Sequence, residues 1–223
     1  YKKRNRCFCK SFAFSTKHVG LKMKIICFYN NYPQLSTSFS EVDVPLFYMK
    51  PDTSILTNNR PFYIPEFVEQ LYCQVELVLK INKLGKYIQE NFAPTYFQEI
   101  ATGVNFFDKK KLNKAIEKGL PWESSCVFEN SAAISPFYDK ENFGPLDTIR
   151  LKLVKNNTEI FQGDTSACIY SSEQLISFIS QYFTMKTGDI LFLGSPIIPI
   201  SLAINDLIEV YLGEEKTMKF RIK

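Results

Sequence analysis

Histidine is almost missing from this 223-residue sequence. The only one, His18, lies within the first 22 residues. The rest of the chain therefore has no Ser-His or Cys-His pair for nucleophilic catalysis and no histidine to ligate zinc. Two common kinds of catalytic centre are thereby excluded from the body of the protein.

Paired cysteines are lacking as well. None of the six cysteines forms a Cys-x-x-Cys pair, and the spacing of Cys7 and Cys9 is too short for a usual zinc knuckle. Cys73 and Cys168 sit in apolar runs, which is typical of small buried side chains. We therefore expect a reducing compartment and a cytoplasmic protein.

Long apolar runs are also absent, since none reaches the length of a membrane span. No membrane association is expected. Hydrophobic residues nevertheless make up 45% of the chain, which is enough for one sizeable core. We predict a single domain over residues 23–223.

Acidic residues are missing from positions 1–22, which hold seven of the 27 Lys and Arg residues. The remainder is mildly acidic, although the formal net charge of the chain is +4. A nucleic-acid-binding domain carries its basic residues within the fold, so no nucleic acid is expected as a partner. Residues 1–22 have the composition of a transit-type presequence. We favour instead a basic extension upstream of Met23 that is not part of the core, and a basic arm for an acidic partner is the third possibility.

The central stretch of the sequence is Tyr72-Cys73-Gln74-Val75-Glu76-Leu77-Val78-Leu79, which reads as a strand. Side chains two residues apart share one face of a strand, so Gln74 and Glu76 point the same way. Two such oxygen-bearing groups can hold a hard cation such as Mg2+. From spacing alone, a solvent-facing polar row is the simpler interpretation.

The remaining pattern predicts many short strands and few helices. Leu112 and Ile116 lie four apart in a helix over residues 109–118, and Ser172 is the expected N-cap of a second helix over 173–183. Residues 95–106 are expected to form a short third helix followed by a strand over 100–106. These elements predict a β-rich α+β domain.

The order of several motifs resembles the fumarylacetoacetate hydrolase family, in particular its small acylpyruvate-hydrolase-like and oxaloacetate-decarboxylase-like members. Each motif is weak alone, but the ordered set is specific and extends over roughly residues 23–223. The matching segments are Phe47-Tyr48-Met49-Lys50-Pro51, Val75-Glu76-Leu77, Lys118-Gly119-Leu120-Pro121-Trp122, Gln162-Gly163-Asp164-Thr165-Ser166, Phe183 with Gly188-Asp189-Ile190, and Gly194-Ser195-Pro196.

The resemblance implies a mixed β-roll or distorted β-sandwich, usually in a homodimer. It also implies hydrolysis of C–C bonds in acylpyruvates, or decarboxylation of oxaloacetate. A Mg2+ or Mn2+ ion would bind the keto and carboxylate oxygens of the substrate and stabilise the enolate that leaves.

The metal positions depart from the family pattern, which is a Glu-x-Glu pair and a later Asp. The corresponding residues here are Gln74, Glu76 and Asn105. One carboxylate remains where the family has three. Because Mg2+ gives up its hydration shell reluctantly and is usually held by carboxylates, we expect a strongly weakened metal site.

Other expected catalytic positions are also changed. Cys126 stands where the family has a Lys, and a thiol cannot supply positive charge to a developing oxyanion. Leu35 stands where a His often activates water, and Lys109 replaces an Arg and so loses the bidentate fork. Lys50 is retained, and Ser195 keeps the hydroxyl of a family Thr; both are expected to bind substrate.

Two functions follow from this pattern. The first is a catalytically impaired family member that keeps the fold and either binds a small keto acid near Lys50, Lys109 and Ser195 or serves as a subunit or interaction surface. The second is an active Mg2+-dependent hydrolase or decarboxylase of a small diketo or keto acid that uses Glu76, Gln74 and Asn105. The loss of charge at several positions favours the first.

Overall fold

Two long antiparallel strands form the centre of the computed structural model, which describes residues 23–33, 44–57 and 59–223. They are β4 (Leu71–Ile81) and β5 (Phe97–Asp108), which pair along nearly their whole length. The apolar run around Gln74 and Glu76 therefore forms a strand, as the sequence predicts. The expectations for residues 1–22 and for Leu35 lie outside the described residues.

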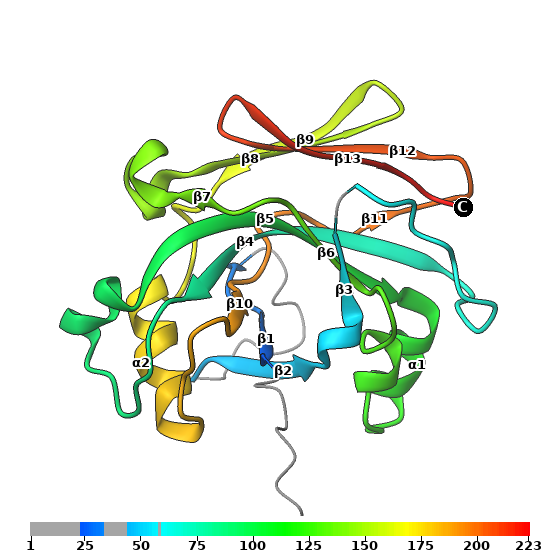
Figure 1. The fold of residues 1–223 in the computed structure, drawn as a ribbon. Coiled ribbons are helices and arrows are strands. Elements are labelled where there is room, and N and C mark those ends of the chain that lie inside the picture. The colour runs from blue at the N-terminus through cyan, green and yellow to red at the C-terminus, as the bar shows by residue number, and fades with distance from the viewer. Residues whose placement is uncertain (1–22, 34–43, 58) are drawn as a thin grey trace, which may run out of the picture.

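The larger sheet has nine strands and curls around β4 and β5 (Figure 1). Its strand order is β2-β1-β10-β4-β5-β6-β3, with β11 paired to β4 and β7 paired to β5. Strand β1 runs parallel to β10 and antiparallel to β2. The bounds of the other strands are β1 Ile25–Tyr29, β2 Leu46–Lys50, β3 Ile55–Leu56, β6 Ala132–Ile134, β7 Tyr138–Asp139, β10 Ile190–Phe192 and β11 Ile200–Ser201.

A second sheet of four strands lies over β4 and β5 (Figure 1). Its order is β13-β12-β8-β9, with β8 Arg150–Lys155, β9 Thr158–Asp164, β12 Leu207–Leu212 and β13 Glu215–Arg221. Phe106 of β5 stacks on Phe62 at 4.2 Å between ring centroids and meets Phe220 of β13 edge-on. The main core thus lies between the two sheets.

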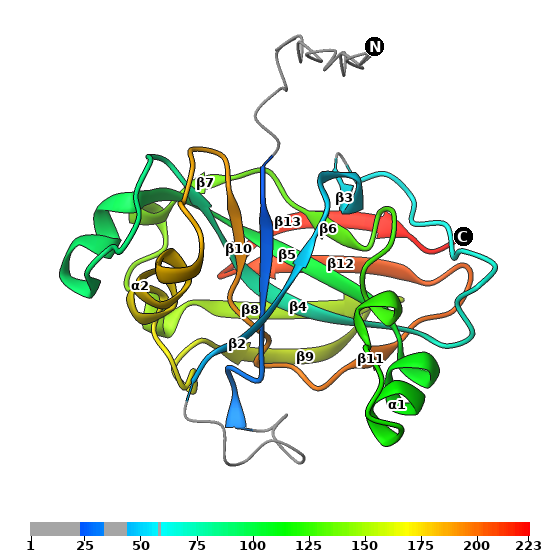
Figure 2. The ribbon, with the colours of Figure 1, turned by 90° about the horizontal axis from the view of Figure 1, so that it is seen from below.

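Two α-helices lie at opposite ends of the larger sheet, with β1 and β10 between them (Figure 2). They are α1 (Lys109–Glu117) and α2 (Ser172–Tyr182). The N-cap of α2 is Ser171, so the prediction of Ser172 was wrong by one residue. Gln174 explains the shift, because it completes a capping box with Ser171 and fixes the helix start there.

Short 3-10 helices connect many of the strands. The third helix, predicted between residue 95 and the strand at 100, is a 3-10 helix that begins five residues earlier, at Glu90, and β5 begins at Phe97, three residues earlier than expected. The 3-10 helices are η2 Asp52–Ser54, η3 Glu90–Tyr96, η4 Glu123–Ser125, η5 Lys140–Asn142 and η6 Leu146–Thr148. Within the described residues, no helix is both long and apolar enough to cross a membrane. The result is the β-rich α+β domain that the sequence predicts.

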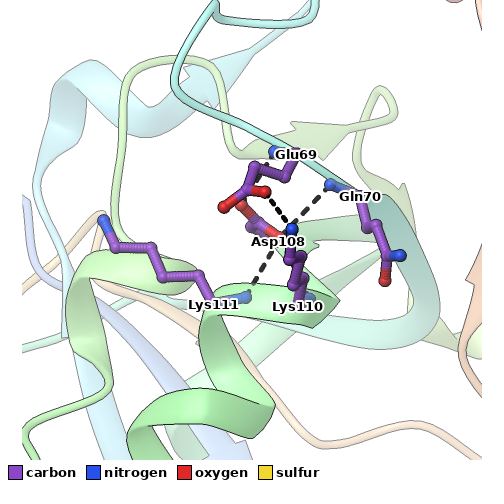
Figure 3. Close-up of polar contacts among 5 residues, drawn as sticks. All are labelled: Glu69, Gln70, Asp108, Lys110 and Lys111. Carbon is purple, nitrogen blue, oxygen red and sulfur yellow. Dashed lines mark hydrogen bonds and ion pairs between the residues drawn. The ribbon is translucent and has the colours of Figure 1, made fainter.

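Asp108 joins the end of β5 to the start of α1 (Figure 3). Its carboxylate accepts hydrogen bonds from the backbone N–H groups of Lys110 and Lys111, which caps the helix. It also accepts from the backbone N–H groups of Glu69 and Gln70, at 2.9 and 3.3 Å. One buried carboxylate therefore fixes the helix against the entry to β4.

Candidate functional site

The register of β4 and β5 brings the predicted metal positions together. Gln74 lies directly opposite Asn105, and Glu76 lies opposite Gly103. Side chains that are directly opposite or two apart share one face of an antiparallel pair. Gln74, Glu76 and Asn105 therefore project from the same face of the sheet.

That face forms one wall of a cavity of about 190 Å3. The cavity is enclosed by aromatic, apolar and polar side chains, and several predicted site residues besides the metal positions are among them. The lining comprises Phe28, Tyr29, Asn30, Tyr48, Gln74, Glu76, Asn105, Phe107, Lys109, Leu112, Trp122, Cys126, Gly194, Ser195 and Pro199.

Glu76 is the only carboxylate among these lining residues. It is 2% exposed, and each of its two oxygens accepts a hydrogen bond. Oε1 accepts from the amide nitrogen of Asn105 at 2.9 Å, and Oε2 accepts from the backbone N–H of Gly194 at 2.9 Å. Burial raises the pKa of Glu76 to about 7, although these hydrogen bonds and the charge of Lys50 oppose the shift.

Asn105 uses both of its N–H groups inside the protein. Nδ2 donates to Glu76 and, at 2.7 Å, to the hydroxyl of Tyr48. Its Oδ1 is buried and has no hydrogen-bond partner among the described residues. Turning the amide over would place an oxygen against the carboxylate of Glu76, so the carboxylate fixes the amide orientation.

Lys50 lies on β2 behind the cavity lining rather than in it. Its side chain is buried, and its ammonium group donates to the carbonyl oxygen and the hydroxyl of Ser131 at 2.8 and 2.9 Å. It is not among the residues that line the cavity. Burial lowers the pKa of Lys50, and the charge of Lys50 in turn lowers the pKa of Glu76.

Ser195 lines the cavity, but its hydroxyl donates to the carbonyl oxygen of Val75 at 2.8 Å and accepts from the backbone N–H of Ile197. This hydroxyl is therefore engaged in holding the loop after β10 against β4. Ser195 and Lys50 stay predictions as substrate-binding residues.

Lys109 and Cys126 both line the cavity. Lys109 makes no salt bridge with any described carboxylate. Burial raises the pKa of the Cys126 thiol to about 11, so this side chain is neutral at physiological pH. Lys109 is thus the one cation that lines the cavity within the described residues.

Several lining residues were not singled out from the sequence. Tyr48 lies two residues before Lys50 on β2, and Trp122 packs edge-on against it at 5.2 Å between ring centroids. Tyr48 is part of the motif that ends at Lys50 and Pro51. Because side chains two apart share one face of a strand, Tyr48 could have been placed on the same face of β2 as Lys50.

Asn30 is the second residue that sequence reasoning missed. It has a φ of 57°, a conformation that Asn tolerates better than most residues, at the turn after β1. Both polar atoms of its amide are buried without a hydrogen-bond partner among the described residues. The Asn30-Asn31 pair signalled the turn but not its place in the cavity.

These residues do not fit the Mg2+ or Mn2+ ion that the resemblance implies. No group of three or more His, Cys, Asp or Glu side chains in the described part of the chain is placed to hold a metal. The carboxylate of Glu76 is satisfied by two N–H donors, and one of them is the nitrogen of a would-be ligand. A hard cation needs several oxygen ligands and is usually held by carboxylates, whereas among the described lining residues Glu76 has the only carboxylate and Asn105 turns its nitrogen toward it, leaving one neutral oxygen free.

Comparison with known proteins identifies relatives along most of the chain. Oxaloacetate tautomerase FAHD1, mitochondrial, of Mus musculus is 29% identical over 204 residues, which cover 89% of this chain and 91% of that protein. Oxaloacetate tautomerase YcgM of Escherichia coli (strain K12) is 26% identical over 176 residues, covering 78% of this chain and 80% of that one.

Solved structures share the fold. A putative fumarylacetoacetate hydrolase family protein from Yersinia pestis CO92 has a TM-score of 0.84 at 24% identity, covering 90% of this chain and 93% of its own. Fumarylpyruvate hydrolase from Pseudomonas aeruginosa, solved in complex with Mn2+ and pyruvate, has a TM-score of 0.80 at 20% identity, covering 90% and 88%. The predicted fold class is confirmed. The family model for the fumarylacetoacetate (FAA) hydrolase C-terminal domain matches residues 24–223, so the chain belongs to the fumarylacetoacetate hydrolase family.

Proposed function

We propose that this protein is a catalytically impaired member of the fumarylacetoacetate hydrolase family, which keeps the pocket but not the divalent-metal chemistry. The observation that carries the proposal is the hydrogen bond of 2.9 Å from the Asn105 nitrogen to Glu76 Oε1. It joins two of the three metal positions directly, so a nitrogen of Asn105 rather than an oxygen faces the carboxylate of Glu76.

The missing charges support the same proposal. A Mg2+ ion that enters this site finds one carboxylate with a pKa of about 7, so that near neutral pH a proton competes for the same oxygen atoms. It would also have to displace the N–H donors of Asn105 and Gly194. Removing hydrogen bonds to a buried carboxylate costs roughly 1.5–3 kcal/mol each, which opposes metal binding further.

The alternative is an active metal-dependent enzyme that acts on a small keto acid. It is favoured by one observation, namely that Gln74, Glu76, Asn105 and Lys109 all still line one cavity. Amide oxygens can ligate hard cations, and the FAHD1 and YcgM relatives are named oxaloacetate tautomerases.

Calorimetric titration of the 223-residue protein with Mg2+ and with Mn2+ distinguishes the two functions. The same preparations are assayed for acylpyruvate hydrolysis, oxaloacetate decarboxylation and oxaloacetate tautomerisation. The control is the triple variant Gln74→Glu, Asn105→Asp, Cys126→Lys. We expect neither metal binding nor metal-dependent turnover in the natural protein, and metal binding in the triple variant.

Micromolar metal binding with turnover in the natural protein would contradict the proposal and establish the active enzyme. The homodimer expected from the resemblance is a separate prediction, which light scattering on the same preparation tests.

A further inference from the structure

A second cavity, of about 270 Å3, lies on the other face of β4 from the candidate site. Glu76 lines the first cavity and Leu77 lines the second, and neighbouring residues of a strand point to opposite faces. The first cavity is lined by residues of α1 and the second by the first turn of α2, and these helices lie at opposite ends of the larger sheet (Figure 2). The two linings have no described residue in common, so the second cavity is a separate site.

The lining of the second cavity is acidic. Among the described residues it holds the carboxylates of Asp147 and Glu173 and no Lys, Arg or His. Neither carboxylate makes a salt bridge within the described part of the chain. Burial raises the pKa of the Cys168 thiol in this lining, and both carboxylates add to the shift, so both charges lie close to that thiol. The N-terminal end of α2 offers only about half a positive charge against these two negative ones, so the cavity attracts a cation.

The hydroxyl of Tyr32 is the second polar feature of this cavity. Tyr32 lines the cavity and is 3% exposed, and its hydroxyl makes no hydrogen bond with a described residue. The side-chain atoms that are both closed off from solvent and unpaired, as far as the structure describes the chain, belong to Asn30, Ser54 and Asn105. The Tyr32 hydroxyl is therefore unpaired but accessible, and because nearly all of the residue is buried, that accessible surface faces the cavity. Its oxygen accepts a hydrogen bond from a donor that enters.

The rest of the wall is apolar and aromatic. Leu77, Leu146 and Leu193 supply apolar surface, and the side chain of Tyr170 adds a second aromatic ring, whose face attracts a cation. An apolar cavity of about 150 Å3 holds a benzene molecule, so a volume of about 270 Å3 has room for about ten heavy atoms. This combination suits a molecule with one cationic end and a short hydrocarbon chain.

We propose that the second cavity binds a small primary ammonium compound with an apolar chain of a few carbon atoms. The ammonium group donates to the Tyr32 hydroxyl and pairs with the carboxylates of Asp147 and Glu173, while the chain packs on the leucines of the wall. An inorganic cation fits less well, because it would leave the apolar wall without contacts and no group of three or more ligating side chains is found within the described residues. The inference is independent of the proposed function, which concerns the first cavity.

The experiment is a calorimetric titration of the 223-residue protein at low ionic strength and neutral pH with three matched probes. Butylamine is cationic under these conditions and carries N–H donors. Butanol has the same chain without the charge, and butyltrimethylammonium has the charge without an N–H group. We expect butylamine to bind about tenfold or more tightly than either of the other two, and added salt to weaken its binding.

Two further readouts identify which cavity is occupied. Cys168 lines the second cavity, so bound butylamine should slow the alkylation of this thiol by iodoacetamide, measured by mass spectrometry of the peptide that contains it. Trp122 is the only tryptophan of the chain and lines the first cavity, so its fluorescence should not change. A change in fluorescence without protection of Cys168 would place the cation in the first cavity and overturn the inference.

Variants test each contact separately. Asp147→Asn and Glu173→Gln should each weaken butylamine binding about threefold or more and leave butanol unchanged. The matched control Glu141→Gln removes an exposed carboxylate outside the lining and should change neither. Tyr32→Phe keeps the ring and removes the acceptor, so it should bring the affinity for butylamine close to that for butyltrimethylammonium.

Equal affinity for butylamine and butanol, or no heat and no protection of Cys168 at millimolar butylamine, would overturn the inference. Binding of butyltrimethylammonium as tight as that of butylamine would overturn the assignment to a primary ammonium group. In each case the proposed function stands, because it depends on metal binding and turnover at the first cavity.

Discussion

Replacing Glu76 by Gln should make the protein more stable at high pH. The pKa of Glu76 is about 7 in the folded protein, against an ordinary value of 4.5. Between these two values, the folded state therefore holds a proton that the unfolded state has released. The stability that this proton contributes is fully present below pH 4.5 and is lost as the pH rises through 7.

The size of the loss follows from the shift. A difference of about 2.5 pKa units corresponds to roughly 3 kcal/mol at about 1.36 kcal/mol per unit. Gln cannot titrate, so Glu76→Gln removes this pH dependence. The amide N–H group that this substitution introduces faces Asn105. A turn of the Asn105 amide then lets its Oδ1 accept from that group and from the Tyr48 hydroxyl, which preserves the hydrogen-bond pairing.

The assay is urea unfolding of both proteins at pH 5, 6, 7 and 8, the range that spans the shift. We expect similar stability at pH 5 and a variant that is more stable at pH 8 by up to about 3 kcal/mol. Glu99→Gln, at a half-exposed position paired with Lys80, is the matched control for the loss of a carboxylate outside the cavity. Parallel pH profiles for the natural protein and Glu76→Gln would refute the reasoning.

Three further predictions concern the scaffold of the site, and each is measured as a change in the free energy of unfolding. Asp108→Ala removes the acceptor of four backbone N–H groups and should cost about 2–4 kcal/mol. A cost smaller than the loss of one helix cap would contradict the role of the Asp108 carboxylate shown in Figure 3. Gly103→Ala places a Cβ against the ring of Phe192 and should cost about 1–3 kcal/mol, so a neutral result would contradict the packing there. Phe192→Leu should recover part of the Gly103→Ala loss in the double variant, and strictly additive effects would show that the two side chains do not meet.

Much of the scaffold could be predicted because the local signals agree with the fold. The alternation around Gln74 and Glu76 is a strand period, and the apolar positions 112 and 116 fall on the helical period of α1. The start of α2 was wrong by one residue because two adjacent serines can both cap, and only the reach of Gln174 back to Ser171 decides between them. Cap choice of this kind depends on a side-chain contact rather than on periodicity.

Most of the residues singled out from the sequence line the cavity, but their hydrogen bonds could not be predicted. Register between β4 and β5 depends on pairing along the whole strands, so the opposition of Gln74 and Asn105 is not visible in either segment alone. The same holds for Lys50, which the sequence suggests for the site but which the structure turns toward Ser131. The unpaired amide of Asn30 follows from the turn geometry, and no sequence pattern specifies it.

The contact between Asn105 and Glu76 also constrains how this protein can change over evolutionary time. Acquiring a metal site by Asn105→Asp alone would set two carboxylates side by side in a buried place, and their repulsion would penalise the intermediate until a cation or a further charge compensated it. A first step through Gln74→Glu would add charge but leave the Asn105 nitrogen against the carboxylate of Glu76. Each single step is therefore unfavourable by itself, so the pairing of amide and carboxylate resists a gradual change toward a metal-binding descendant.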